Sequence, residues 1–72
     1  MTATQDVTIT LNGQEKALTA PLTVRDLLRE MGMADQRVAV ELNKEIVPRS
    51  RHAEVHLQDN DRVEVVAAIG GG

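Results

Sequence analysis

The chain begins with an alternation of apolar and polar residues that predicts a β-hairpin. Residues 7–11 read Val-Thr-Ile-Thr-Leu, the period of two that is typical of a strand with one buried face. Asn12-Gly13 follows, and both residue types tolerate the positive φ angles of a tight hairpin turn. Residues 14–19 return as a second strand that includes Glu15 and Lys16. Because charge protects an exposed sheet edge, we expect this second strand to be an edge strand.

After Ala20-Pro21 the apolar spacing changes to that of a helix. Apolar residues now fall at i, i+3, i+4 and i+7, which is one face of a helix: Val24, Leu27, Leu28 and Met31. Thr23 and Asp26 are spaced as a capping box at the start of this segment, and Gly32 stands where a C-terminal cap belongs. The pattern predicts a short helix over about residues 24–31.

The second half of the chain predicts three more strands. Residues 38–42 form one, with Val38, Val40 and Leu42 facing inward, and Asn43-Lys44 makes a tight turn into a short strand that stops at Pro48. Residues 63–69 form the last strand. Its apolar residues fall on both faces: Val63, Val65, Ala67 and Ile69 on one, Val66 and Ala68 on the other. This predicts a central strand that is covered on both sides, or nearly so, and that pairs with the first strand.

Residues 49–58 carry no clear period, and we expect an irregular segment anchored by Val55 and Leu57, followed by a turn at Asp59-Asn60-Asp61. The order of elements predicts an α+β domain, a mixed sheet of roughly four to five strands with one helix packed across one face. We expect residues 1–69 to form this single domain and residues 70–72 to form a flexible glycine tail.

Composition excludes several classes of function. The 72 residues include no cysteine and no aromatic residue, and the formal net charge is −3. Thiolate metal sites and iron–sulfur clusters are therefore excluded, and a nucleic-acid or anionic-membrane partner is disfavoured. No segment is long and apolar enough to span a membrane, and residues 1–6 do not resemble a signal peptide. Without cysteines the sequence does not indicate a redox compartment, and the cytoplasm is the default expectation.

Neither histidines nor acidic residues predict a metal site. His52 and His56 are spaced i, i+4, which on a helix could bind zinc, but the alternating pattern around them favours an extended segment with two solvated histidines. A calcium loop starting at Asp59 would need glutamate at its twelfth position, where Gly70 stands. No nucleophile–base pair is recognisable either, because Ser50 near His52 is a coincidence of sequence. We expect no catalytic residue and no cofactor bound by the chain.

The most informative residues are the last four, Ile69-Gly70-Gly71-Gly72. A chain without Cβ atoms can thread a narrow channel in another protein, and it ends in a carboxyl group with no side chain beside it. This carboxylate is a poor electrophile until it is activated, for example as a mixed anhydride with a nucleotide, after which sulfur can replace the nucleotide at Gly72. A frayed terminus and a cloning remnant are the alternatives that require no function.

Several motifs along nearly the whole chain resemble those of the ThiS family, the sulfur carrier proteins of thiamine biosynthesis. The helix segment Thr-Val-Arg-Asp-Leu-Leu from Thr23 resembles the family's TVxxLL, and residues 38–43 resemble its third strand and turn. Ile46-Val47-Pro48-Arg49 matches the family's IVPR, residues 57–61 resemble its xxDGD turn with Asn60 in place of glycine, and the glycine ending also matches. His52 stands where many relatives have an aromatic residue.

This resemblance implies a β-grasp, ubiquitin-like fold and a carrier that is a substrate of enzymes rather than an enzyme. It implies adenylation of Gly72 by an E1-like enzyme of the ThiF type that uses ATP and magnesium, conversion to a thiocarboxylate, and sulfur supplied by a cysteine desulfurase or another donor. Sulfur would pass to a thiazole synthase of the ThiG type. Ile69, Gly70, Gly71 and Gly72 would enter the partners' channels, and Arg49 with Arg51 could dock an acidic partner surface.

Other functions stay open at this point. A similar carrier could serve molybdopterin synthesis or another sulfur-requiring pathway, and a ubiquitin-like modifier would use the same tail chemistry as far as the adenylate. A plain β-grasp binding module is a further alternative, and a self-contained enzyme is the least favoured class.

Overall fold

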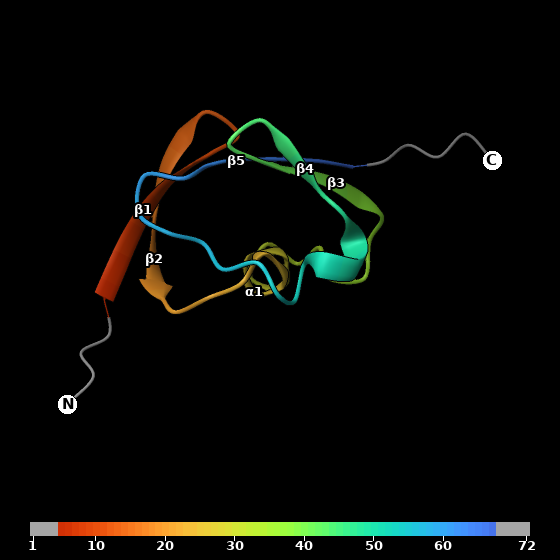
Figure 1. Ribbon diagram of the computed structural model, residues 1–72, viewed down its shortest axis with the longest axis horizontal. Helices are drawn as coiled ribbons and strands as arrows, with labels where there is room; N and C mark the ends of the chain where they lie inside the picture. Colours follow the sequence, from red (N-terminus) through yellow and green to blue (C-terminus); the bar gives the residue numbers. More distant parts are fainter. Residues whose placement is uncertain (1–4, 68–72) are drawn as a thin grey trace.

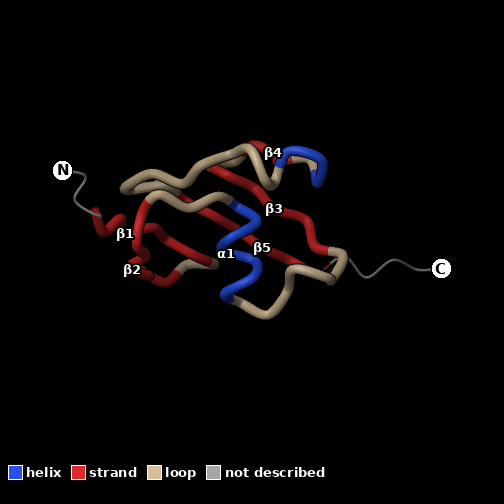
Figure 2. Tube along the Cα trace, turned by 90° about the horizontal axis from the view of Figure 1, so that it is seen from below, coloured by secondary structure: helices blue, strands red, loops and turns tan. Residues whose placement is uncertain are grey.

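The computed structural model describes residues 5–67 of the chain. Within these residues, five strands form one mixed sheet, and a single α-helix packs across one face of it (Figures 1 and 2). The strand order is β2-β1-β5-β3-β4. In chain order the elements are β1 (Gln5–Leu11), β2 (Gln14–Ala20), α1 (Val24–Glu30), β3 (Val38–Leu42), β4 (Glu45–Val47), the 3-10 turn η1 (Arg49–Arg51) and β5 (Arg62–Ala67).

The first hairpin forms as its turn residues predict. Asn12 and Gly13 adopt φ angles of 50° and 84°, and β1 and β2 pair antiparallel up to Leu11 opposite Gln14. The Asn12 side chain also bonds across to β5: its Nδ2 donates to the Val65 carbonyl at 3.2 Å, and its Oδ1 accepts from the Val65 amide at 2.8 Å. The turn therefore fixes the position of β5 as well as that of β2.

Helix α1 has the predicted caps. The Asp26 amide donates to Thr23 Oγ1 at 3.1 Å, and the Thr23 amide donates to Asp26 Oδ2 at 2.9 Å, which completes a capping box. The hydrogen bond from the Thr23 backbone lowers the pKa of Asp26 below its usual 3.8, with smaller support from the Thr23 hydroxyl and from nearby Arg29 and His56. Gly32 follows the last turn with a φ of 73°, as a C-terminal cap requires.

The first and last strands pair in the middle of the sheet, as predicted. β5 runs parallel to β1, with Leu11 opposite Val63, and antiparallel to β3, with Val40 opposite Val65. β2 is an edge strand, which confirms the interpretation of its charges. The expectation that β5 is covered on both faces is wrong: Val66 is 59 % exposed, because α1 covers one face of the sheet and residues 5–67 supply nothing to cover the other (Figure 1).

The core lies between α1 and the covered face of the sheet. Among the described residues, its buried apolar side chains are all aliphatic: Val7, Ile9, Leu18, Leu22, Val24, Leu27, Leu28, Val40, Val47, Leu57, Val63 and Val65. Each fully buried side chain of this size contributes about 1.5–3 kcal/mol, so many small contributions replace the aromatic residues that the chain lacks. Leu57 anchors the return to β5 as expected, and Val55 packs against the core beside it.

Residues 48–61 are less irregular than the sequence indicates. η1 follows Pro48, and one isolated bridge joins Thr23 to His56. The Arg25 amide donates to the His52 carbonyl at 2.9 Å, and the Leu57 amide donates to the Leu22 carbonyl at 2.9 Å. These bonds tie the segment to the start of α1. The turn at residues 59–61 forms as predicted, with Asn60 at a φ of 72°.

Candidate functional site

The residues to which the sequence assigns the chemistry lie outside the described residues. These are Ile69, Gly70, Gly71 and Gly72, and the structure therefore does not test the prediction for the tail. It does show what surrounds the last described residues. Ala67 pairs with Val38 at the beginning of β3. The last residue of β5 therefore lies beside the point where the loop after α1 enters β3 (Figure 2).

The open sheet face is the surface of the sheet opposite α1, on β3, β4 and β5. Register and alternation place five side chains on it: Ala39, Glu41, Ile46, Glu64 and Val66. Ile46 is 64 % exposed and Val66 is 59 % exposed, and these are the two exposed large apolar side chains in residues 5–67. Val66 lies directly opposite Ala39, which is also exposed. A small apolar patch therefore lies one residue before the end of β5.

Charged residues border this patch. Glu41 and Glu64 lie directly opposite one another, an arrangement that is unfavourable by itself because like charges repel across strands. Lys44 and Arg62 line the same shallow depression of about 90 Å³, and their positive charge offsets that repulsion. The open sheet face thus combines an apolar end near Val66 with a mixed-charge end near Arg62.

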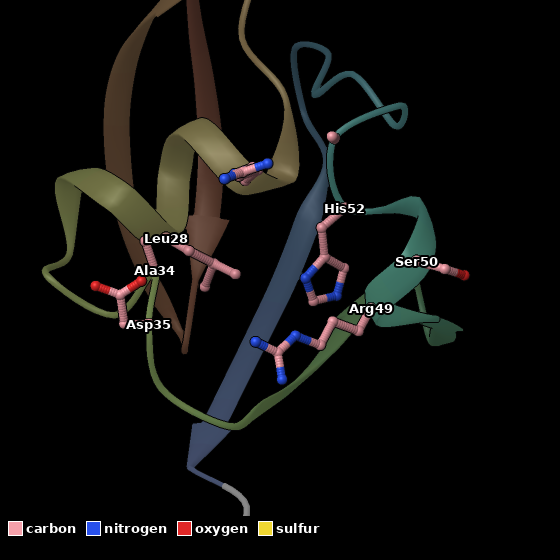
Figure 3. A pocket seen from close by; sticks show the side chains of 8 residues that line it. Leu28, Ala34, Asp35, Arg49, Ser50 and His52 are labelled. Atoms are coloured by element: carbon pink, nitrogen blue, oxygen red, sulfur yellow. The ribbon is translucent and has the colours of Figure 1, made fainter.

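Arg49 and Arg51, predicted together as a docking pair, are directed to different places. Arg51 Nε lies 3.5 Å from Glu54 Oε2 in an exposed ion pair, an interaction typically worth about 0.2–1 kcal/mol. Arg49 instead lines a cavity between α1 and η1, together with Arg25 and His52 (Figure 3). Sequence spacing did not indicate the proximity of Arg25 to this segment, because it depends on how residues 49–53 pack against the helix.

His52 corrects the expectation of two solvated histidines. Its side chain is only 7 % exposed, and Nε2 lies 3.0 Å from the Val47 carbonyl oxygen. A carbonyl only accepts, so the hydrogen bond assigns the proton to Nε2. The reason for the error is local: residues 49–51 form a 3-10 turn instead of extended chain, and this turn rotates His52 inward. His56 is exposed, as expected.

Two further observations concern metals and membranes. Within residues 5–67, no group of three or more His, Cys, Asp or Glu side chains is placed to hold a metal ion. No helix in that part of the chain has the length and apolar character needed to cross a bilayer.

Comparison with known proteins agrees with this architecture. The chain matches the ThiS family over residues 9–72. A crystal structure of the thiamine biosynthesis protein ThiS from Geobacter metallireducens superposes with a TM-score of 0.79 at 32 % identity, covering 92 % of this chain and 100 % of that one. The fold is therefore a β-grasp, as the sequence motifs implied.

Curated relatives are of two kinds. The sulfur carrier protein ThiS of Escherichia coli is 33 % identical over 64 residues, which cover 89 % of this chain and 97 % of that protein. A thiazole synthase of Paramagnetospirillum magneticum is 48 % identical over 64 residues, 89 % of this chain, and the chain spans only 20 % of that protein's length. The chain belongs to the ThiS family, which confirms the resemblance seen in its motifs.

Proposed function

We propose that the chain is a sulfur carrier of thiamine biosynthesis that holds sulfur as a thiocarboxylate on Gly72. The single observation that supports this most strongly is that the family match extends through residue 72 and so includes the terminal glycines. Full-length relatives named as sulfur carrier proteins support a carrier that is acted on by enzymes, rather than an enzyme.

The proposed chemistry follows from the terminal carboxyl group. With a reference pKa of about 3.3–3.7 it is ionised at neutral pH, and it resists attack by nucleophiles. One carboxylate oxygen attacks the α-phosphorus of ATP, with magnesium on the nucleotide, and pyrophosphate leaves. Hydrosulfide, or a persulfide supplied by a cysteine desulfurase or another donor, then attacks the carbonyl carbon and AMP leaves. With hydrosulfide the product is the thiocarboxylate directly. A persulfide gives an acyl disulfide, which a thiol reduces to the thiocarboxylate.

An E1-like enzyme of the ThiF type is the proposed activating partner, and a thiazole synthase is the proposed acceptor of sulfur. A thiazole synthase is proposed as the acceptor because 89 % of this chain is similar to a segment of the thiazole synthase of Paramagnetospirillum magneticum. That segment makes up 20 % of the synthase. Activation consumes ATP, so we place the protein in the cytoplasm.

The open sheet face is the proposed contact for these partners. A partner that binds residues 69–72 in a channel must also touch the surface next to the end of β5. Val66 and Ala39 provide apolar contact there, and Glu64 and Arg62 provide charge farther along β5, toward its start. Apolar anchors surrounded by polar side chains are the usual composition of a binding patch.

Intact-mass spectrometry tests the proposal. The full chain is incubated with a purified ThiF-type enzyme, ATP, magnesium and sulfide, and we expect the mass increase that results from replacing one oxygen by sulfur, located at Gly72 by fragmentation. A chain that lacks Gly72 should stay folded and gain no sulfur, whereas a chain shortened by residues 2–4 should react normally. Sulfur on the chain without Gly72 contradicts the proposal.

A pull-down and an in vitro assay separate the remaining alternatives. Transfer of sulfur to a thiazole synthase, and not to a molybdopterin synthase, supports the thiamine pathway. Isopeptide-linked adducts on lysines of other proteins would instead indicate a ubiquitin-like modifier.

A further inference from the structure

A cavity of about 310 Å³ lies between α1 and η1, on the side of the sheet away from the open sheet face. Leu28 forms an apolar wall, and Arg25, Asp35, Arg49 and His52 line the remainder (Figure 3). Ser50 also borders the cavity, but its hydroxyl points away from it in Figure 3. The sulfur-carrier chemistry proposed above makes no use of this cavity.

Its two guanidinium groups have no acidic partner in the part of the chain that the structure describes. Arg25 comes from α1 and Arg49 from η1, and the ion pair present among residues 5–67 joins Arg51 to Glu54 instead. Asp35 borders the cavity but makes no ion pair with either arginine within those residues. Two planar groups, each with five N–H donors, therefore line one cavity without an ion-pair partner among residues 5–67.

His52 adds a third nitrogen-bearing group to the cavity, and its Nδ1 atom is free to interact. Its Nε2 donates a hydrogen bond to the Val47 carbonyl oxygen at 3.0 Å, and its Nδ1 makes no hydrogen bond to any of residues 5–67. No buried side-chain nitrogen or oxygen of those residues lacks a partner, so Nδ1 is not sealed inside the protein. Figure 3 shows one ring nitrogen of His52 turned toward the centre of the cavity. With its proton on Nε2, His52 presents Nδ1 as an acceptor.

We propose that this cavity binds the phosphate group of a small phosphate ester. Two arginines match the two charges of a phosphate monoester, and each can bind oxygens of the group in the bidentate manner. Nδ1 of His52 can accept a hydrogen bond from a hydroxyl group of the ester. A tetrahedral phosphate group can contact protein side chains from three directions, whereas a planar carboxylate group offers only two oxygens. The cavity exceeds the size of a bare ion, and Leu28 provides a surface for the carbon part of the ester.

Titration of the full chain followed by NMR tests the proposal. The probes are glycerol 3-phosphate, inorganic phosphate and acetate, each at the same ionic strength in sodium chloride. We expect glycerol 3-phosphate to give saturating shifts at the Arg25 and Arg49 side chains and at His52, with acetate at least about tenfold weaker. Absence of saturation overturns the proposal. Equal binding of acetate also overturns it, and would indicate a site for an acidic side chain of a partner protein.

Matched variants locate the site. Arg25→Gln and Arg49→Gln should each weaken the binding of glycerol 3-phosphate about tenfold or more, since a hydrogen bond to a charged group is typically worth at least one factor of ten. Arg51→Gln, in the same segment but outside the cavity, should leave the affinity unchanged, and Asp35→Asn should raise it. If Arg51→Gln weakens binding as much as Arg49→Gln, the binding is nonspecific and the proposal is wrong.

These variants change exposed side chains, so dispersed amide spectra will confirm folding in each case. The readout needs neither ATP nor sulfur. A failed titration therefore leaves the proposed carrier function intact, and failure of sulfur transfer leaves this site intact.

Discussion

Asn12 should contribute to stability mainly through its side chain and only secondarily through its turn. The change to make is Asn12→Gly, which keeps a residue that adopts a φ of 50° without strain and removes both hydrogen bonds to Val65, at 3.2 and 2.8 Å. A hydrogen bond of this kind contributes about 0.5–1.5 kcal/mol. Loss of two predicts a destabilisation of about 1–3 kcal/mol.

The matched control is Asn60→Gly. Asn60 has a φ of 72°, and its side chain makes no hydrogen bond to the other described residues, so this change removes only the turn preference of asparagine. We expect it to alter the free energy of unfolding by at most about 0.5 kcal/mol. The comparison separates the conformational role of asparagine from its hydrogen bonds.

Thermal and urea unfolding measure both variants. For a domain of this size, 1 kcal/mol corresponds to a change in Tm of about 4–8 °C, so Asn12→Gly should lower Tm by about 4 °C or more. Amide exchange should also accelerate at Val65 in this variant. If Asn12→Gly and Asn60→Gly have equal effects, the bonds to Val65 contribute nothing and the reasoning is refuted.

Three further predictions concern the core, the cap and the open sheet face. His52→Ala should cost about 2–4 kcal/mol in urea unfolding, because it creates a cavity and leaves the Val47 carbonyl unpaired, whereas His52→Phe should cost clearly less; equal losses would show that ring packing is unimportant. Asp26→Asn should lower stability by about 0.3–1 kcal/mol at pH 7. Because the pKa of Asp26 in the folded state lies below 3.8, its stabilising effect is complete above that value and is lost as the pH falls through the folded pKa. The difference in Tm between Asp26→Asn and the unchanged protein should therefore be present at pH 7 and disappear in acid. A difference that stays the same at both pH values would contradict this. Val66→Glu should leave Tm within a few degrees but slow adenylation of the chain, whereas Ala17→Glu on β2, also exposed, should leave the rate unchanged; equal rates for the two variants would show that Val66 does not contact the enzyme.

Local signals in the sequence predicted most of the fold. The hairpin at Asn12-Gly13, the capping box at Thr23 and Asp26, and the C-cap at Gly32 each depend on residues within a few positions of one another. The central position of β5 was predicted correctly from its apolar content, but that same content led to the wrong expectation for Val66. A strand with apolar residues on both faces can be covered on both sides or exposed for a partner on one side, and the pattern alone does not distinguish these cases.

The features that sequence reasoning missed all depend on contacts between distant segments. The alternating pattern around His52 predicts an extended segment with a solvated side chain, and no local signal marks residues 49–51 as a 3-10 turn. The hydrogen bonds between the Asn12 side chain and Val65 join residues 53 positions apart. The cavity between Arg25 and Arg49 exists only once the segment around η1 is bonded to the start of α1 through Arg25 and His52. For the glycine tail the situation is reversed. The sequence alone predicts its chemistry, and its residues lie outside the described part of the chain.

The pairing of β5 determines how the domain responds to a pulling force applied at the C-terminal end of β5. On one side β5 forms five residue pairs with β3. On the other side it pairs with β1 and is bonded by the side chain of Asn12. Its inter-strand hydrogen bonds to antiparallel β3 lie across the strand direction. A pull along β5 therefore loads these bonds in shear, so that they must yield together instead of unzipping one after another. A load applied along β5 therefore meets its greatest resistance at the first step, because the strand cannot leave the sheet one hydrogen bond at a time.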